Sequence, residues 1–238
     1  MSKTLKPNLV NLFNLGFDLV KSAVSSFNLK ELALAVDSVL TDKMSLNKPG
    51  QRHMLKSSKI VYDFANSPQI MELASVALGN DCQPVRALLF NKTSNSNWFV
   101  PWHQDITIAV KEHKIFPGFI NYTLKDGLIH VQPPAHILEQ MLAIRIHLDD
   151  STNSNGAIKF YKGSHLSGIL TQSQINDLIT NQTNIVSCQA LTGDIIIMKP
   201  LIVHSSPKIA STNLTRRVLH IEYALNNILP STIEFQIA

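Results

Sequence analysis

The sequence predicts a mainly β domain with flanking helices, an α+β arrangement in which helices come first and a β-barrel or sandwich follows. Apolar residues at helical spacing dominate residues 1–84, whereas short strand-like runs dominate residues 85–225. The chain has 238 residues, of which 45% are hydrophobic and 16% are charged, enough for one domain with a sizeable core. We therefore expect residues 1–238 to form a single domain.

Two helices are predicted in the N-terminal part. The first is capped by Asn28 and carries an apolar stripe over residues 29–40, with Glu31 at its third position. The second opens at Pro68 and stops at Gly79. A further short helix is expected over residues 169–180.

The remaining elements are strands separated by turns. The predicted strands cover residues 85–90, 100–110, 141–148, 158–161, 195–199 and 216–224. Residues 111–140 contain several turn signals and are expected to be an irregular insertion. Long insertions in compact domains are often lids over a site, although a plain structural loop is an equal alternative here.

Two of the predicted strands alternate between an apolar face and a face that carries an arginine and a histidine. The polar face has Arg145 and His147 in one strand, and Arg216 and His220 in the other. These faces could lie in water, as in a half-exposed antiparallel strand. They could instead line a polar site inside a barrel. Because the N-terminal helices need a sheet face to bury against, the second interpretation is favoured.

His103 and Asp105 lie two residues apart in an aromatic and apolar segment, where an unpaired carboxylate would be costly. In a strand such residues point the same way, about 6.6 Å apart. A third ligand from a distant strand would complete a two-histidine, one-carboxylate metal site, which is typical of non-haem Fe(II) oxygen chemistry. His204, after the apolar residues 200–203, is the favoured third ligand.

Other interpretations of the same residues remain. His103 could be a core histidine and Asp105 a turn residue. His147 and His220 are the serious rivals for the third ligand position, ahead of the remaining histidines, which are His53, His113, His130, His136 and His165. Arg216, near His204, is a candidate anchor for a carboxylate co-substrate.

Charge and composition argue against several partners. Lys and Arg exceed Asp and Glu by 21 to 17, and this net charge of +4 is too small and too scattered for a nucleic-acid-binding protein. The N-terminus lacks a signal-peptide core, and no stretch is apolar enough to cross a membrane. The chain has only two cysteines, Cys82 and Cys188, so a reducing and cytoplasmic location is expected. A small molecule is expected as the substrate.

Several short motifs occur in a characteristic order: WHQD at 102–105, NSNGAI at 153–158, KGSH at 162–165, GDIII at 193–197, PLIVHSS at 200–206 and RRVL at 216–219. As an ordered set they resemble the phytanoyl-CoA dioxygenase family of Fe(II)- and 2-oxoglutarate-dependent oxygenases. The resemblance covers roughly residues 85–225. It implies a double-stranded β-helix, a jelly-roll or cupin-like barrel, with the N-terminal helices packed on one sheet.

The resemblance also implies roles for individual residues. It makes His103, Asp105 and His204 the ligands of Fe(II), and Arg216 the partner of the distal carboxylate of 2-oxoglutarate. Ser206 lies where the family often adds a hydroxyl to that carboxylate. Arg145 lies on the strand that usually faces the co-substrate, although the family often has another residue there. The spacing from His204 to Arg216 is slightly long for the family, so Arg217 is an alternative anchor that strand phase disfavours.

The implied reaction is hydroxylation of a small molecule with Fe(II), 2-oxoglutarate and O2, because halogenating relatives lack the carboxylate that Asp105 provides. Candidate substrate or lid contacts are Trp102, Lys125, His130, Gln132, His147 and His220. The rival functions are a cupin-like metal-binding protein or isomerase without oxygen activation, and a catalytically idle interaction module. The intact ligand set and Arg216 argue against an idle module.

Overall fold

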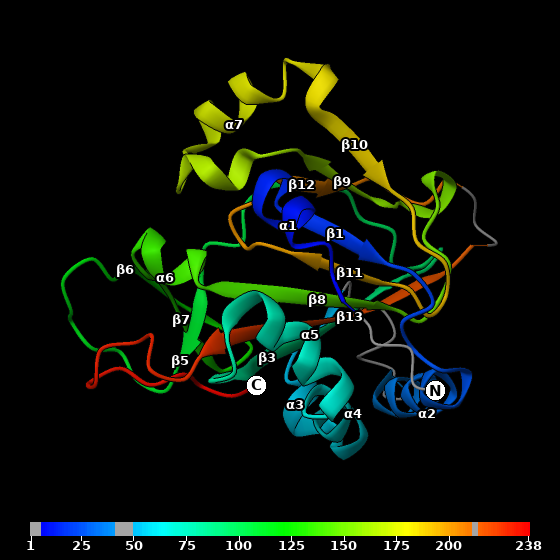
Figure 1. The fold of residues 1–238 in the computed structure, drawn as a ribbon, viewed down its shortest axis with the longest axis horizontal. Coiled ribbons are helices and arrows are strands. Elements are labelled where there is room, and N and C mark those ends of the chain that lie inside the picture. The colour runs from blue at the N-terminus through cyan, green and yellow to red at the C-terminus, as the bar shows by residue number, and fades with distance from the viewer. Residues whose placement is uncertain (1–5, 41–49, 211–213) are drawn as a thin grey trace.

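Two antiparallel sheets face each other in the computed structural model, which describes residues 6–40, 50–210 and 214–238 (Figure 1). The six-stranded major sheet has the order β1 (Phe17–Val20), β11 (Ile195–Met198), β8 (Met141–His147), β13 (Arg216–Leu225), β3 (Cys82–Lys92), β2 (Gly50–Gln51). The four-stranded minor sheet has the order β10 (Ile185–Cys188), β9 (Ile158–Tyr161), β12 (His204–Ser206), β4 (Val100–His103). The chain passes repeatedly between the two sheets, as in a jelly roll, which confirms the predicted fold class.

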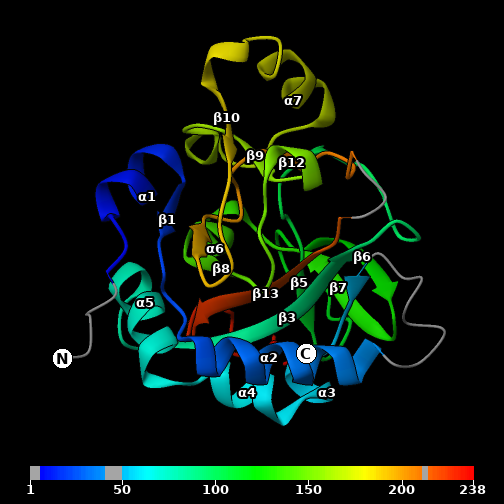
Figure 2. The same ribbon diagram turned by 90° about the vertical axis from the view of Figure 1, so that its right-hand side faces the viewer.

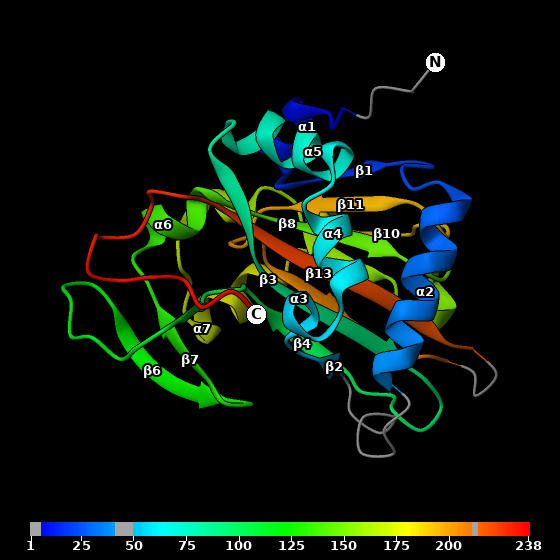
Figure 3. The ribbon, with the colours of Figure 1, turned by 90° about the horizontal axis from the view of Figure 1, so that it is seen from below.

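Helices cover the outer face of the major sheet. They are α2 (Ser26–Leu40), α3 (Met54–Ser57), α4 (Lys59–Ala65) and α5 (Pro68–Leu78), while α1 (Leu9–Leu15) precedes edge strand β1. Figures 2 and 3 show α2, α3 and α4 lying across β3 and β13. Ile144 of β8 and Ile221 of β13 share one core cluster with Leu32 of α2 and Leu73 of α5. The apolar faces therefore point outward to the helices, and the arginine-bearing faces point into the barrel.

Three details of the N-terminal part differ from the sequence prediction. Residues 17–20 form strand β1, which pairs with β11 and extends the major sheet. Helix α2 begins at Ser26, earlier than predicted. The Ser25 hydroxyl accepts a hydrogen bond from the backbone N–H of Asn28 (3.2 Å), so serine caps the helix and Asn28 lies in its first turn.

The predicted strand over residues 100–110 is two strands, β4 and β5 (Ile108–Val110), in different sheets. The break has a tertiary cause, because the buried Gln104 side chain donates to the carbonyl oxygens of Gly168 (2.8 Å) and Leu201 (2.6 Å). The apolar residues 200–203 form a buried turn, and strand β12 begins at His204.

The segment 111–140 is not irregular. It contains β6 (Ile120–Lys125), β7 (Leu128–Gln132) and α6 (Ala135–Glu139), and β7 joins β5 and β6 in a three-stranded sheet. Helix α7 (Gln172–Leu178) lies within the predicted residues 169–180. Short 3-10 turns occupy Asn153–Asn155, Ser164–Ser167 and Gln182–Asn184. Within the described ranges, no helix combines the length and apolar character that crossing a membrane requires.

Candidate metal centre and co-substrate site

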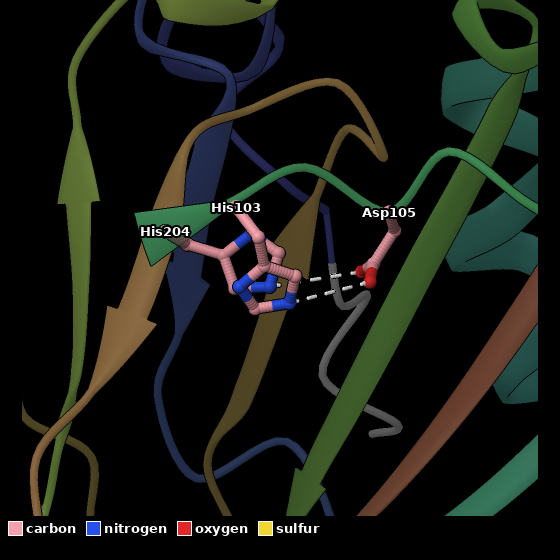
Figure 4. Close-up of side chains that lie close together, drawn as sticks. All are labelled: His103, Asp105 and His204. Atoms are coloured by element: carbon pink, nitrogen blue, oxygen red, sulfur yellow. Dashed lines mark ion pairs between the residues drawn. The ribbon is translucent and has the colours of Figure 1, made fainter. Parts of the chain in front are cut away.

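Two histidines and one aspartate meet where β4 and β12 pair. His103 ends β4, His204 begins β12, and the two residues are direct partners across the strands. The carboxylate oxygens of Asp105 lie 3.8 Å from His103 Nε2 and 3.7 Å from His204 Nε2. The candidate ligand atoms all lie within 4.8 Å of one another, and Figure 4 shows both imidazoles turned toward the carboxylate. This spacing fits a single shared metal ion.

Both imidazoles are held in the tautomer that a metal ligand needs. His103 Nδ1 lies 2.8 Å from the carbonyl oxygen of Pro101, and His204 Nδ1 lies 2.9 Å from that of Ile202. A carbonyl oxygen only accepts, so Nδ1 carries the proton and Nε2 carries the free lone pair. The Nε2 atoms are the ones that face Asp105. Hydrogen bonds of this kind orient metal-binding histidines in proteins.

The electrostatic surroundings favour the protonation states that bind a cation. Burial, and then repulsion from His103, lowers the pKa of His204 to about 3, so this ring is neutral at neutral pH. Burial opposes the charge of Asp105, but attraction to His204, His103, His220 and Arg86 together holds the pKa of this carboxyl well below its usual range. A neutral imidazole and an ionised carboxylate are the forms that coordinate a divalent cation. The three side chains therefore fit the ferrous ion that the sequence predicts.

Beside these ligands the barrel contains a second group of side chains, which we call the basic cluster: Lys92, Arg145, His147 and Arg216. All four are buried. Lys92 and Arg216 are partners across β3 and β13, and the Lys92 Nζ donates to the Ser206 hydroxyl at 2.8 Å. Burial lowers the pKa of Arg145, and attraction to the nearby Asp105 carboxylate opposes this shift. The basic cluster therefore lies near the candidate metal ligands.

The basic cluster lacks a counter-charge. Among the described residues, no carboxylate forms an ion pair with Lys92, Arg145 or Arg216. Burial, and then repulsion from the two arginines, lowers the pKa of Lys92 to about 7. Within the described chain, the Nε atoms of both arginines and both ring nitrogens of His147 have no hydrogen-bond partner. Buried charges and donors without partners are costly, so the cluster is suited to receive an anion.

The structure separates Arg216 from its neighbour Arg217. Arg216 points into the barrel, where its Nη1 donates to the Gly156 carbonyl. Arg217 lies on the other side of β13, where its Nε and Nη2 contact Asp149 at 2.9 and 2.8 Å, and its Nη1 contacts Asp37 of α2 at 2.8 Å. Strand phase thus identified the interior arginine correctly.

In a second charged group in the barrel, Arg86 and Glu222 compensate each other. Arg86 Nε donates to Glu222 Oε2 at 2.9 Å, a second contact joins the same two side chains, and Arg86 Nη1 lies 3.1 Å from His130 Nδ1. His220 Nε2 lies 3.5 Å from Glu222 Oε1, and its Nδ1 lies 3.0 Å from Arg145 Nη1. Among the described residues, neither His220 nor His147 belongs to the group that can share a metal.

Sequence reasoning missed Arg86 and Lys92. Both lie on β3 at positions that alternate with its apolar face, so they point into the barrel. The predicted strand ended at residue 90, before Lys92. Extending the period of two over residues 82–92 would have placed both cations on the same face as Arg216 and Glu222 across the sheet.

The remaining predicted contacts lie elsewhere. Trp102 packs with Tyr161 and Ile175 near α7, because it faces the opposite side of β4 from His103. Lys125 is exposed on β6, and the Gln132 side chain accepts a hydrogen bond from Asn121 at 3.0 Å within the same hairpin. Among the described residues, four more histidines lie outside the group that can share a metal: His53, His113, His136 and His165.

The model of the phytanoyl-CoA dioxygenase (PhyH) family matches residues 33–218. The chain belongs to the phytanoyl-CoA dioxygenase family. This membership confirms the resemblance found in the sequence, and with it the class of 2-oxoglutarate-dependent dioxygenases and their cofactors, Fe(II), 2-oxoglutarate and O2. A search of curated proteins found no match.

Solved structures of similar fold agree with the family. EctD from S. alaskensis with 2-oxoglutarate and 5-hydroxyectoine has a TM-score of 0.70 and 16% identity, over 92% of this chain and 75% of that chain. HygX from Streptomyces hygroscopicus with nickel and 2-oxoglutarate bound has a TM-score of 0.68 and 12% identity, over 92% and 86% of the two chains. The non-heme alpha ketoglutarate dependent carbocyclase SnoK has a TM-score of 0.67 and 13% identity, over 90% and 81%. At these identities the likeness concerns the fold.

Proposed function

We propose that this member of the phytanoyl-CoA dioxygenase family hydroxylates a small molecule, with His103, Asp105 and His204 as the ligands of Fe(II). The observation that carries the proposal is that a candidate metal site and a candidate anion site lie side by side in the barrel. A two-histidine, one-carboxylate group lies beside a buried basic cluster that has no carboxylate partner among the described residues. One site fits a divalent metal and the other fits an anion, which is what a metal-chelating dianion such as 2-oxoglutarate requires.

In this proposal, ferrous iron supplies the activation of O2, coupled to oxidative decarboxylation of 2-oxoglutarate to succinate and carbon dioxide. The protein residues bind and orient the reactants. Arg216 receives the distal carboxylate of 2-oxoglutarate, with Lys92 and Ser206 as further donors. Arg145 and His147 lie on the adjacent strand and contribute positive charge and free donors. Because these side chains are buried, their attraction to an anion is weakly screened by water.

Asp105 directs the proposal toward hydroxylation. Its carboxylate provides the third protein ligand, so no ligand position on the protein side is left for a halide. The Arg86 and Glu222 pair lies about 20 Å from the Arg216 end along β13, six residues away. Since this pair is already compensated, it does not compete for the co-substrate anion and is better suited to hold the interior wall. We also propose a reducing, cytoplasmic setting, in keeping with the free and buried Cys82 and Cys188.

The test is succinate formation from 2-oxoglutarate by the purified protein over a panel of metabolites, with detection of products that have gained one oxygen atom. We expect turnover to require both Fe(II) and O2, and to be lost in His103→Ala while the fold persists. The exposed His136→Ala variant is the matched control and should keep activity. Full activity in His103→Ala would remove this residue from the site, and Fe(II) binding without any succinate would support a metal-binding protein that does not activate oxygen.

A further inference from the structure

A cavity of about 400 Å³ lies outside the candidate metal centre and the basic cluster. We call it the Lys199 cavity. Its lining residues are Phe13, Leu138, Glu139, His165, Leu166, Lys199 and Leu201. They come from α1, α6, the turn at Ser164–Ser167 and the turn that follows β11. The cavity volume is within the range of roughly 300–1,000 Å³ that small-molecule sites occupy.

Most of the cavity wall is apolar. Leu138 and Leu201 are buried, whereas Phe13 and Leu166 remain 50% and 72% exposed. Two large apolar side chains thus remain exposed to water at the cavity, where a bound ligand could cover them. Apolar walls around a few polar groups are the usual composition of a site for a small organic molecule.

Lys199 is the cation of this cavity, and its side chain is short of partners. The residue is only 9% exposed. Its Nζ donates to the Glu139 carbonyl oxygen at 3.1 Å and lies 5.8 Å from the centre of the Phe13 ring. An ammonium group has three donors, and among the described residues no carboxylate forms an ion pair with Lys199. Burial lowers the pKa of Lys199, and the nearby Glu139, an exposed residue, opposes this effect only in part.

His165 adds a fixed, neutral group. It is 8% exposed, and its Nε2 lies 3.0 Å from the Phe13 carbonyl oxygen, so Nε2 donates this hydrogen bond. Its Nδ1 has no hydrogen-bond partner within the described residues. The ring packs directly against Gly16, where a Cβ atom would come within 2.6 Å of Nδ1. His165 therefore holds Phe13 in place without adding a charge. The charged side chains of the cavity are the buried Lys199 and the exposed Glu139, so Lys199 is the only one of the two shielded from water.

We propose that the Lys199 cavity binds a small carboxylate with an apolar body. The carboxylate takes the free donors of Lys199, and the apolar body packs against Leu138, Leu166 and Leu201. The ligand compensates a buried cation and covers exposed apolar surface in one step. This site is separate from the proposed 2-oxoglutarate site, because it shares no residue with the metal ligands or the basic cluster.

The site is nevertheless adjacent to the metal centre. Asp105 donates its backbone N–H to the Pro200 carbonyl oxygen at 2.9 Å, and Pro200 lies between the cavity residues Lys199 and Leu201. Leu138 lines the cavity and also a much smaller hollow next to Asp105. One turn of chain therefore forms a wall of the cavity on one side and holds a proposed iron ligand on the other.

The test is calorimetric titration of the full chain with 3-phenylpropanoate, with Mn(II) and 2-oxoglutarate present so that the 2-oxoglutarate site is filled. We expect saturable binding, and binding at least about tenfold weaker for the uncharged 3-phenylpropanol, since a hydrogen bond to a charged group contributes about 1.5–3 kcal/mol. Lys199→Met should reduce the affinity for the carboxylate by a similar factor. Lys56→Met removes an exposed lysine on α3 and is the matched control that should bind normally.

A second variant protects the test against misfolding. Leu166 is largely exposed, so Leu166→Glu should fold normally while its carboxylate repels the ligand and weakens binding. The proposal is overturned if the wild type does not bind 3-phenylpropanoate, or if it binds the alcohol equally well. Unchanged affinity in both folded Lys199→Met and Leu166→Glu would place the ligand elsewhere and overturn it as well.

Discussion

Replacing Arg216 by methionine should weaken 2-oxoglutarate binding without lowering the free energy of unfolding of the co-substrate-free protein. Arg216 is 2% exposed and shares the barrel with Arg145 and Lys92, and no carboxylate compensates it within the described chain. Two charge-assisted hydrogen bonds to a carboxylate contribute about 1.5–3 kcal/mol each. Since Lys92 remains to bind the same carboxylate, we expect a loss of about 3 kcal/mol, or roughly a hundredfold in the dissociation constant.

The stability of the co-substrate-free protein should respond in the other direction. Burial, and then repulsion from Arg145, lowers the pKa of Arg216, so its charge is unfavourable in the empty site. The Gly156 carbonyl that Arg216 contacts also accepts from the Ser206 hydroxyl at 2.8 Å, so the substitution leaves that oxygen with a donor. Exchanging an uncompensated buried charge for an apolar side chain of similar length is neutral or stabilising, by up to about 1–4 kcal/mol.

Two measurements test this reasoning. Calorimetric titration with 2-oxoglutarate in the presence of Mn(II) gives the dissociation constant, and urea unfolding without co-substrate gives the free energy of unfolding. Arg217→Met is the matched control, because Arg217 lies on the outer face of the same strand. If Arg216→Met binds 2-oxoglutarate within threefold of the wild type, or if its empty form loses several kcal/mol, Arg216 is a structural residue and the anion site is misassigned.

Three further predictions concern other residues. Gln104→Leu removes the hydrogen bonds that fix the segment between His103 and Asp105, so Mn(II) affinity measured by titration should fall about 10–100-fold while the fold persists; unchanged affinity would contradict this. Lys92 has a pKa of about 7 in the empty site, so 2-oxoglutarate affinity should decrease above pH 7, by at most about tenfold per pH unit, and this decrease should vanish in Lys92→Met. The unfolded chain binds the Lys92 proton more tightly, so the stability of the empty protein should rise with pH from about 7 to 10.5 in the wild type only. Arg217→Met should lower the free energy of unfolding by about 1–2 kcal/mol in urea, with 2-oxoglutarate affinity unchanged; lower affinity would point to Arg217 as an anchor.

Local alternation, together with the need of the N-terminal helices for a sheet face, predicted the interior of the barrel. On β8 and β13, successive side chains point to opposite faces, so Arg145 and Arg216 could be assigned to the polar face before any contact was known. The same alternation distinguished Arg216 from Arg217. These predictions succeeded because they depend on the geometry of one strand rather than on its neighbours.

Features that depend on distant segments could not be predicted in this way. The break after His103 comes from Gln104, whose side-chain hydrogen bonds reach Gly168 and Leu201, more than sixty residues away. Strand β1 exists because residues 17–20 pair with β11, far along the chain. In each case the partner, not the local sequence, decides the conformation.

The two buried charged groups in the barrel differ in whether the protein completes them. Arg86 and Glu222 pair with each other, and His130 and His220 contact them on either side, so the two opposite charges compensate each other within the protein. The basic cluster is not complete, because within the described chain its cations repel one another and the Nε atoms of Arg145 and Arg216 have no hydrogen-bond partner. A fold that tolerates such a cost has its compensation in a ligand, since an anion bound only by the native state stabilises that state in proportion to its affinity. The incomplete cluster is therefore where we propose that the co-substrate binds, and the Arg86 and Glu222 pair lies further along the same two strands, β3 and β13.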